Sequence, residues 1–312
     1  MKILITGGIG FIGSSLAIEL CKYGYRIVLF DIRDNNKGEK IYEKHINISF
    51  IKGDINDSQK LTKIFKENTI DGIIHLAAIS RVIDAEENPE QCIKTNIIGF
   101  ETIIKSIQDI KHKKPWLIFG SSREVYGEPE FFPVNENFEK KYVNIYGKSK
   151  VKGEKITSNY ALENNVSTLI LRFSNVYGNK YDLLDRVVPK FITSIANENK
   201  ITIEGGKQII DFTHIDDTVH AIVQSIDYIK RNERVIDDFH ILPGVGWSLQ
   251  DLIKIIENKL NKKAKLKISS KRTYDVEKFI GDSSKMKAKL KTRNFLSLKE
   301  GIEKSIPKYL EG

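Results

Sequence analysis

The strongest constraint on this chain is a short apolar strand that runs into glycines and then into a helix. The segment reads Lys2-Ile-Leu-Ile-Thr-Gly-Gly-Ile-Gly-Phe-Ile-Gly13. The first spaced glycine allows a tight turn, the second lets a pyrophosphate approach the backbone, and the third lets the helix pack against the strand. The N–H groups of the first helical turn then face the anion. We expect nucleotide contacts from Gly7, Gly10, Phe11, Ile12 and Gly13.

A second buried strand, Arg26–Asp31, follows and ends in an acidic residue. A carboxylate there can accept both hydroxyls of an adenosine ribose and repels a 2′-phosphate, so Asp31 favours NAD over NADP. Arg33 is able to bind that phosphate and leaves the choice open, and Asp31 can also be read as a solvated turn residue. The residues expected at the adenosine end are Asp31, Ile32 and Arg33.

Further apolar runs alternate with helical patterns through the first half of the chain. The runs are Ile48–Ile51, Gly72–Ala77, Trp116–Phe119 and Thr168–Leu171, and the helical segments are Ser58–Glu67, Pro89–Ile110 and Tyr146–Glu163. This alternation predicts an α/β protein with a Rossmann-type doubly wound parallel sheet. We place the dinucleotide-binding domain at residues 1–172.

The second half has shorter elements and should form a smaller C-terminal α/β substrate domain, mainly residues 173–312 and interleaved with the first. Ligands of open α/β sheets bind beyond the carboxyl ends of the strands, so this region is placed to close over a substrate. The expected helices are Val187–Ala196, Asp217–Ile229, Leu249–Leu260 and Leu298–Tyr309, and the expected strands are Ile201–Ile203 and Phe239–Leu242.

The net charge of +9 lies entirely at the carboxyl end. From Lys262 onward there are 15 Lys and Arg against 6 Asp and Glu, which accounts for the whole surplus. A solvated basic face or a weak attraction for a phosphorylated substrate explains it, and no nucleic-acid motif is present. The two cysteines, Cys21 and Cys92, lack metal-ligand spacing. With no long apolar run and no signal-peptide pattern, we expect a cytoplasmic protein without a membrane partner or metal.

Tyr146 and Lys150 stand four residues apart in a predicted helix and therefore share one side of it. A neighbouring ammonium and an oxidised nicotinamide both favour a phenolate, so this tyrosine can take a proton from a sugar hydroxyl. Ser122, after the strand Trp116–Phe119, can bridge substrate and phenol. Such pairs are common on helix surfaces and serines often cap turns, but the position after this strand favours hydride chemistry over acyl transfer.

Six motifs occur in the order of a known family. They are Thr6-Gly-Gly-Ile-Gly-Phe-Ile-Gly13, His75-Leu-Ala-Ala78, Ser122-Arg-Glu-Val-Tyr-Gly127, Tyr146-Gly-Lys-Ser-Lys150, Leu171-Arg-Phe-Ser-Asn-Val-Tyr-Gly178 and Asp211-Phe-Thr-His-Ile-Asp-Asp217. The chain resembles the extended short-chain dehydrogenases/reductases of the nucleotide-sugar epimerase/dehydratase family over nearly its whole length. The resemblance implies NAD, a nucleotide diphosphate sugar, and a homodimer through a four-helix bundle that includes Asn96–Ile110 and Tyr146–Glu163.

The resemblance also assigns individual residues. Positions that match cofactor contacts are Asp54 and Ile55 for adenine, Leu76, Ala77 and Ala78 for the middle of the cofactor, Asn96 for the sheet interior nearby and Phe173 for the nicotinamide end. Positions that match or adjoin substrate contacts are Ser80, Arg81, Asn175 and Arg272. A guanidinium fork suits a diphosphate at Arg272, whereas Arg81 is equally well explained as a surface residue.

Two departures from the family pattern concern the substrate. Ile210 stands where many relatives have a phosphate-binding arginine, for which Lys190, Lys207 or Arg272 would have to compensate. Arg123 stands where dehydratases have an acid or a small residue, and it cannot donate a proton at neutral pH.

Glu124, which follows Arg123, keeps dehydration possible. All relatives share oxidation of the sugar at C4, and we expect a 4-epimerase. A 4,6-dehydratase or a 4-dehydrogenase stays open, and so does a non-catalytic NAD-binding scaffold.

Overall fold

A parallel sheet forms the centre of the protein. The computed structural model describes residues 1–36, 39–108, 110 and 112–311. Within these residues, seven strands pair in the order β10-β6-β5-β4-β1-β2-β3, all parallel. They are β1 Lys2–Thr6, β2 Arg26–Asp31, β3 Ile48–Lys52, β4 Gly72–His75, β5 Trp116–Ser122, β6 Thr168–Phe173 and β10 Ile236–Ile241. The strand order reverses between β1 and β4, which opens a crevice there.

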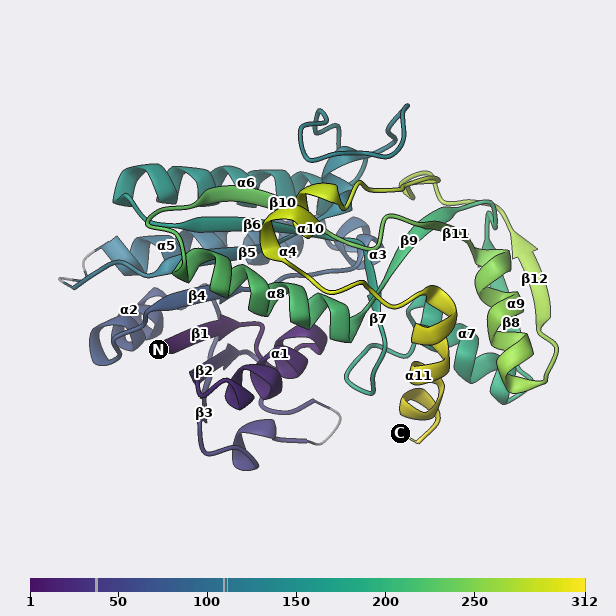
Figure 1. The fold of residues 1–312 in the computed structure, drawn as a ribbon, viewed down its shortest axis with the longest axis horizontal. Helices are drawn as coiled ribbons and strands as arrows, with labels where there is room; N and C mark the ends of the chain where they lie inside the picture. Colours follow the sequence, from purple (N-terminus) through teal and green to yellow (C-terminus); the bar gives the residue numbers. More distant parts are fainter. Residues whose placement is uncertain (37–38, 109, 111, 312) are drawn as a thin grey trace.

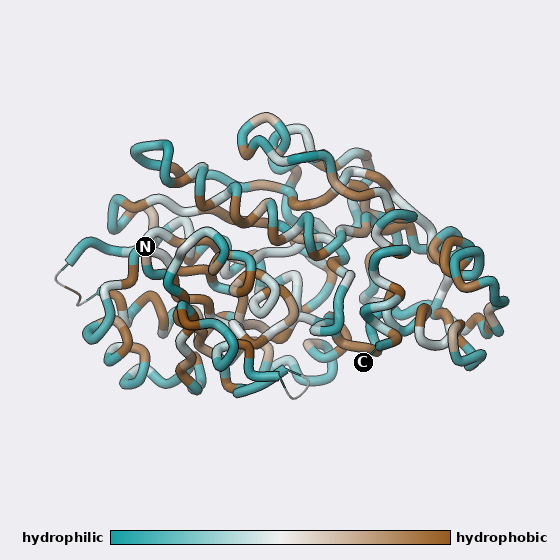
Figure 2. Tube along the Cα trace, turned by 60° about the horizontal axis from the view of Figure 1, so that its bottom comes forward, coloured by the Kyte–Doolittle hydropathy of each residue, from teal (hydrophilic) through white to brown (hydrophobic). Residues whose placement is uncertain are grey.

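Helices cover both faces of this sheet, as Figure 1 shows. One face carries α1 Phe11–Lys22, α8 Ile215–Lys230 and α10 Ser284–Leu290, and the other carries α2 Ser58–Glu67, α5 Gly99–Gln108 and α6 Ile145–Asn164. Neighbouring strand residues alternate between two cores, because Ile3 packs toward α1 while Leu4 packs toward α5. Figure 2 shows the hydrophobic stretches inside and the hydrophilic ones at the outer loops. The predicted fold class is confirmed.

The second part lies at the carboxyl end of the sheet. It contains a three-stranded sheet, β11-β9-β7, and a two-stranded sheet, β12-β8, among the residues described. The strands are β7 Asn175–Tyr177, β8 Lys200–Glu204, β9 Ile209–His214, β11 Gly246–Ser248 and β12 Lys265–Ser269. The helices α7 Val187–Ala196, α9 Leu249–Leu260 and α11 Leu298–Leu310 share one core with β7, β8, β9 and β11, whereas β12 lies outside it.

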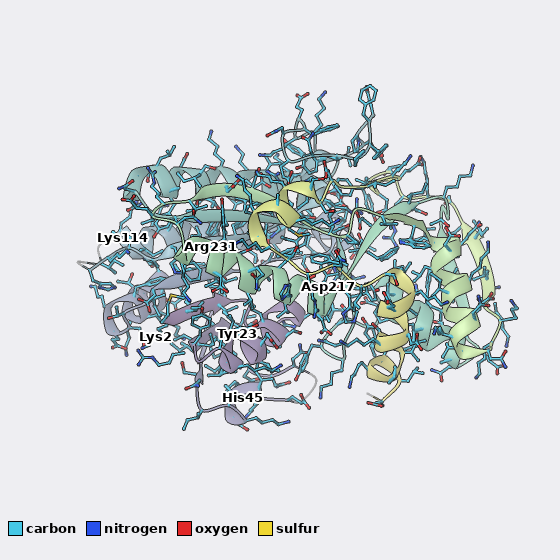
Figure 3. All side chains as sticks on the ribbon, viewed as in Figure 1. Lys2, Tyr23, His45, Lys114, Asp217 and Arg231 are labelled. Carbon is cyan, nitrogen blue, oxygen red and sulfur yellow. The ribbon has the colours of Figure 1, made fainter. Side chains whose placement is uncertain are left out.

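The two parts are interleaved along the chain. Strand β10 comes from the second half of the sequence but pairs with β6 in the central sheet. The segment before α11 also returns to α8, where the Arg293 guanidinium and the Leu296 N–H both bind the carboxylate of Asp217, labelled in Figure 3. A boundary near residue 172 therefore falls at the end of β6, but both parts exchange segments across it.

The predicted helix Pro89–Ile110 differs most from the structure. A separate helix α3, Val82–Glu87, precedes α4, Pro89–Ile93, and a π-helical turn at Lys94–Ile98 interrupts the run before α5. Helix α5 ends at Gln108, and residue 109 of the predicted helix lies outside the described residues. The π turn contains Asn96, whose side chain bonds to another loop, and such bulges accommodate side chains with a tertiary role.

Candidate active site

A cavity of about 880 Å³ lies where the carboxyl ends of the central strands meet the second part. This volume is at the upper end of the usual range for ligand sites, about 300 to 1,000 Å³. The sequence-predicted residues that line it are Gly7, Gly10, Phe11, Ile12, Gly13, Asp31, Ile32, Arg33, Asp54, Ile55, Leu76, Ala77, Ala78, Ser80, Arg81, Ser122, Arg123, Glu124, Tyr146, Lys150, Phe173, Asn175, Lys190 and Arg272.

The glycine loop has the geometry of a phosphate cradle. Gly7 has φ of +68°, and a Cβ on it would come within 2.7 Å of the Ala77 nitrogen, while a Cβ on Gly13 would strike the Gly7 carbonyl. A Cβ on Gly10 would lie 3.0 Å from the Gly7 carbonyl oxygen and 3.6 Å from the Arg33 guanidinium. Helix α1 begins without a side-chain cap or an acidic residue in its first turn. The loop therefore fits a dinucleotide pyrophosphate.

Asp31 is a buried carboxylate, 6% exposed, rather than a solvated turn residue. Its Oδ2 accepts the Ile9 N–H at 3.0 Å and its Oδ1 accepts the Arg33 N–H at 3.0 Å. The Arg33 Nε lies 3.5 Å from Oδ1. The carboxylate thus joins the glycine loop to the end of β2 and presents negative charge to the cavity, which suits ribose hydroxyls better than a phosphate.

Asn96 does not line the cavity. Its Oδ1 accepts the Ile79 N–H at 2.8 Å, and its Nδ2 donates to the Ile79 carbonyl at 3.1 Å and to the Ser149 Oγ at 2.9 Å. Through these bonds Asn96 holds the loop after Ala78 against helix α6, and its expected contact with the cofactor stays a prediction.

Tyr146 and Lys150 enter the cavity from the first turns of α6. Asn144 caps this helix by accepting the Gly147 N–H at 2.7 Å. The Lys150 Nζ lies 5.6 Å from the centre of the Tyr146 ring and donates to the Gly120 carbonyl at 2.7 Å. Strand β5 ends at Ser122 in the same cavity, so a phenol, a hydroxyl and an ammonium converge there.

Burial dominates the electrostatics of this group. It raises the pKa of Tyr146 to about 12, against the hydrogen bond from Ser122 and the charge of Arg186, which both favour the phenolate. Burial also lowers the pKa of Lys150 to about 8. Two cations therefore act on the phenol, the Arg186 guanidinium and the Lys150 ammonium over its ring, and Lys150 also holds the end of β5.

Arg123 and Glu124 follow Ser122 in a short 3₁₀ helix, Arg123–Tyr126. The Arg123 Nη2 lies 2.9 Å from the Glu124 Oε1, and the Asn144 Nδ2 donates to the Glu124 Oε2 at 2.8 Å. The Arg123 Nε also donates to the Asn175 Oδ1 at 3.3 Å. Glu124 therefore has one donor on each carboxylate oxygen, and Asn175 is joined to this group.

The remaining cations divide into paired and unpaired groups. Arg272 forms an ion pair with Glu204, and both line the cavity. Lys190 also lines it and has no ion-pair partner among the described residues, whereas Lys207 does not line the cavity. Of the three candidates to replace the arginine missing at Ile210, Arg272 and Lys190 are therefore within reach of a ligand.

A segment that we call the strap, residues 179–186, lines the cavity and contacts both parts of the protein. On the side of the central sheet, the Tyr181 hydroxyl donates to the Glu39 Oε2 at 2.8 Å. The Arg81 Nη1 pairs with the Asp185 Oδ2 at 2.7 Å. Arg81 therefore closes one edge of the cavity and is not a free surface residue.

On its other side the strap is held by helix α11. The Tyr309 hydroxyl donates to the Asp182 Oδ2 at 3.0 Å and accepts the Gly178 N–H at 2.6 Å. The Asp182 Oδ1 lies 3.5 Å from the Arg186 Nη1. This chain of contacts, from the C-terminal helix to the cavity, fixes the arginine that acts on Tyr146.

Sequence reasoning missed Asn144, Arg186 and the buried Asp211. Asn144 could have been found, because an asparagine two residues before Tyr146 is a common N-cap. Arg186 carries no local signal, and Asp211, although it opens one of the motifs given above, shows its burial only in the fold. Across the described residues, no cluster of three metal-ligating side chains occurs. None of their helices has the length and apolar character to cross a membrane.

Residues 4–305 match the family model described as GDP-mannose 4,6 dehydratase. The chain is 34% identical to dTDP-D-glucose 4,6-dehydratase of Dictyostelium discoideum over 82% of its own length, and it spans 62% of that protein. It is 32% identical to UDP-glucose 4-epimerase of Yersinia enterocolitica, over 88% of each chain.

Two solved structures have the same fold over nearly the whole chain. UDP-glucose 4-epimerase of Thermotoga maritima, solved with UDP-glucose, has a TM-score of 0.90 and 28% identity, over 100% of this chain and 99% of that one. UDP-glucuronic acid 4-epimerase of Bacillus cereus, solved with UDP-glucuronic acid and NAD, has a TM-score of 0.90 and 26% identity with the same coverage.

Proposed function

The chain belongs to the NAD-dependent nucleotide-sugar epimerase/dehydratase family, and from this membership we propose that it is a nucleotide-sugar 4-epimerase. The observation that carries the proposal is the convergence of Ser122 and Tyr146 in the cavity that also holds the glycine loop. A proton acceptor and a dinucleotide cradle in one cavity are what oxidation of a sugar hydroxyl requires. Bound NAD would accept the hydride from C4 and would later return it to C4.

The chain's own residues would divide the work as follows. Tyr146 takes the proton of the C4 hydroxyl, Ser122 holds that oxygen by a hydrogen bond, and Lys150 keeps the end of β5 in place through the Gly120 carbonyl. The cradle for NAD consists of Gly7, Gly10, Phe11, Ile12 and Gly13, with Asp31 at the ribose. Arg272, Lys190 and Asn175 are the proposed contacts of the sugar diphosphate.

The strap favours an epimerase over a dehydrogenase. Its contacts with Glu39 and Arg81 join the two parts across the cavity. A cofactor held there between turnovers suits a reaction without net oxidation, whereas a dehydrogenase has to exchange its cofactor. A 4,6-dehydratase remains the second candidate, because Glu124 lines the same cavity and the Dictyostelium relative carries that name.

Product analysis tests the proposal directly. The protein is incubated with UDP-, GDP-, dTDP- and CDP-hexoses, and the products are identified by mass and NMR. A sugar of unchanged mass with inverted C4 supports the proposal. Loss of water would assign a dehydratase, and loss of two hydrogens a dehydrogenase. Calorimetry with both dinucleotides should give tight binding of NAD and much weaker binding of NADP, because Asp31 repels a 2′-phosphate.

Replacement of the base gives the complementary test. Tyr146→Phe should lower kcat by about 10² to 10⁴, the usual contribution of a general base, with NAD binding retained. Tyr142→Phe is the matched control, because Tyr142 precedes the same helix but does not line the cavity. Unchanged turnover in Tyr146→Phe would show that the base is another group.

We further propose a homodimer through α5 and α6. Leu162 on α6 is 69% exposed, and Ile98, directly before α5, is 49% exposed, which leaves apolar side chains for a partner to cover. Sedimentation of the wild type should give a dimer, and Leu162→Asp should shift it toward monomer. A monomeric wild type would contradict this assembly.

A further inference from the structure

One charged pair in the cavity has no task in the proposed reaction. Arg123 and Glu124 are 8% and 6% exposed, and both line the cavity beside Ser122 and Tyr146. Two buried ionisable groups are costly unless they satisfy each other, so a role for the pair has to be sought in the reaction itself.

Both oxygens of the Glu124 carboxylate already have donors. The Arg123 Nη2 lies 2.9 Å from Oε1, and the Asn144 Nδ2 donates to Oε2 at 2.8 Å. Asn144 is itself fixed, because it caps α6 and its Nδ2 also lies 3.2 Å from the Tyr274 carbonyl. The carboxylate is thus held on two sides by side-chain donors that fix its orientation.

Glu124 is the carboxylate that neutralises Arg123. The Arg123 Nη1 is buried and has no hydrogen-bond partner within the described chain, and the same holds for the Asp211 Oδ1. Burial raises the pKa of Asp211 to about 8, so Asp211 is mostly protonated at pH 7 and does not compete for the guanidinium. Among the described carboxylates, Glu124 is the one that forms an ion pair with Arg123.

A free carboxylate at this position would endanger the reaction. Oxidation at C4 makes the hydrogen on C5 acidic, because the carbanion is stabilised by the adjacent ketone. A base that removes this proton opens an elimination, in which the C6–O bond breaks and a C5–C6 double bond forms. The proton taken from C5 then leaves with the C6 hydroxyl as water, and nothing is oxidised or reduced in this step.

We propose that Arg123 determines the outcome of the reaction, because its pairing with Glu124 keeps that carboxylate from removing the C5 proton and so reserves the 4-ketone for epimerisation. Arg123 acts through Glu124 and is a positioning residue rather than a proton carrier. The inference rests on the proposed C4 oxidation, since only a 4-keto sugar has an acidic C5 hydrogen.

The first experiment uses the wild-type protein in D₂O. UDP-glucose and dTDP-glucose are the probes, and the one that is turned over is followed by NMR and mass through many turnovers. The wild type should invert C4 without incorporating deuterium at C5. Deuterium at C5 in the wild type would overturn the inference, because it would show that a base reaches that carbon in spite of Arg123.

The second experiment removes the charge. Arg123→Met should incorporate deuterium at C5 at least about 100-fold faster than the wild type, as expected for a freed general base. It should release a 4-keto-6-deoxy sugar, in which water has left, C6 has taken the hydride that C4 gave up and C5 has taken a deuteron from the solvent. Arg123→Lys keeps the charge and should incorporate deuterium at C5 no faster than the wild type. Arg123→Gln is made in parallel as a second neutral variant, and thermal unfolding identifies any variant that does not fold.

The double variant Arg123→Met/Glu124→Gln identifies the base. Both deuterium incorporation and dehydration should disappear in it, because the amide cannot accept the proton. Neutral variants that still invert C4 without deuterium at C5 would overturn the role of Arg123 and leave the proposed epimerase intact. A wild type that itself dehydrates the probe would instead overturn the proposed function.

Discussion

The two ends of the cavity are built in different ways. The end formed by Gly7, Gly13 and Asp31 relies on backbone, since the glycines admit no side chain and the carboxylate is held by two backbone N–H groups. The opposite end relies on long charged side chains that are already paired with one another. These pairs are Arg81 with Asp185, Arg123 with Glu124 and Arg272 with Glu204.

The first end can therefore bind a ligand without rearrangement, whereas at the second end a ligand has to compete with carboxylates of the protein. At the glycine end, the donors left for an anion are the N–H groups of the first turn of α1, which has no side-chain cap, so binding costs little rearrangement. At the charged end, a phosphate has to replace an internal carboxylate before it gains an arginine, so its affinity depends on an exchange of partners. Substitutions should therefore only weaken binding at the first end, whereas at the second end their sign should depend on which partner is removed.

The largest effect is expected from Gly13→Ala. Its Cβ would collide with the backbone of the Gly7–Gly8 turn, and such overpacking costs about 1 to 3 kcal/mol of unfolding free energy. The displaced loop should also bind NAD at least about 100-fold more weakly, because each lost backbone contact to a charged phosphate is worth about 1.5 to 3 kcal/mol. Thermal unfolding and calorimetry measure the two effects.

Gly10→Ala is the matched control for this prediction. A Cβ there would lie 3.0 Å from the Gly7 carbonyl oxygen, against 2.3 Å for a Cβ on Gly13, so the apoprotein should lose less stability than with Gly13→Ala. NAD binding should still weaken, since the methyl group occupies the path of the pyrophosphate. Equal losses of stability in both variants would mean that the two glycines do not have the separate roles assigned here.

The glycine end was predicted from the sequence because its constraints are local. A strand, a turn and a helix adjoin in the chain, so glycine spacing and the apolar run define Gly7, Gly13 and the start of α1 together. The Tyr146 and Lys150 pair was likewise visible, because a spacing of four residues puts two side chains on one side of a helix.

The charged end was only partly predictable, because its geometry joins distant segments. The sequence indicated that Arg81, Arg123 and Arg272 matter, and Glu124 adjoins Arg123 in the chain, but Asp185 and Glu204, the partners of Arg81 and Arg272, come from other elements. The π turn around Asn96 and the short strands β7 and β9 were missed for a related reason, since tertiary contacts and not hydrophobic periodicity define them.

The next effect concerns Arg272 and its partner. Arg272→Gln should weaken the binding of the nucleotide sugar about 10-fold or more, because a charge-assisted hydrogen bond to phosphate is lost. Glu204→Gln should instead strengthen it several-fold, about the value of a surface ion pair that no longer has to be broken. Titration of UDP at constant salt measures both changes.

Lys271→Gln provides the control for this pair of variants. Lys271 neighbours Arg272 and pairs with Glu277, but it does not line the cavity. Its affinity for UDP should stay close to that of the wild type. If Glu204→Gln weakened binding as much as Arg272→Gln, the pair would serve only to hold the fold, and the proposed exchange of partners would be wrong.

The two buried aspartates, Asp211 and Asp31, should affect the pH dependence of stability differently, and this effect is expected to be smaller. Burial raises the pKa of Asp211 to about 8, so the folded protein keeps a proton that the unfolded chain releases near pH 4. Folded stability should therefore fall as the pH rises from about 4 to about 8. Asp211→Asn should remove this loss and gain more than about 1.4 kcal/mol over the wild type between pH 5 and pH 8, the equivalent of one pKa unit.

Asp31→Asn, measured in the same experiment, should lower the stability that Asp211→Asn raises. Both Asp31 oxygens accept backbone N–H groups, so an amide nitrogen would face a donor and destabilise the fold at every pH. Urea unfolding at pH 5 and pH 8 compares the two variants. A constant difference between Asp211→Asn and the wild type across that range would show that Asp211 has no raised pKa.

The smallest effect is expected from Arg186, whose charge reaches from the strap to Tyr146. This charge lowers the pKa of the phenol, so Arg186→Gln should raise it and move the acid limb of kcat to higher pH by less than about one unit. Arg186→Lys keeps the charge and should leave the limb in place. Loss of activity at all pH values without a shift would mean that Arg186 only holds the strap. Tyr309→Phe removes the donor to Asp182 without changing any charge. If this variant moves the acid limb part of the way, the contact through Asp182 orients the Arg186 guanidinium.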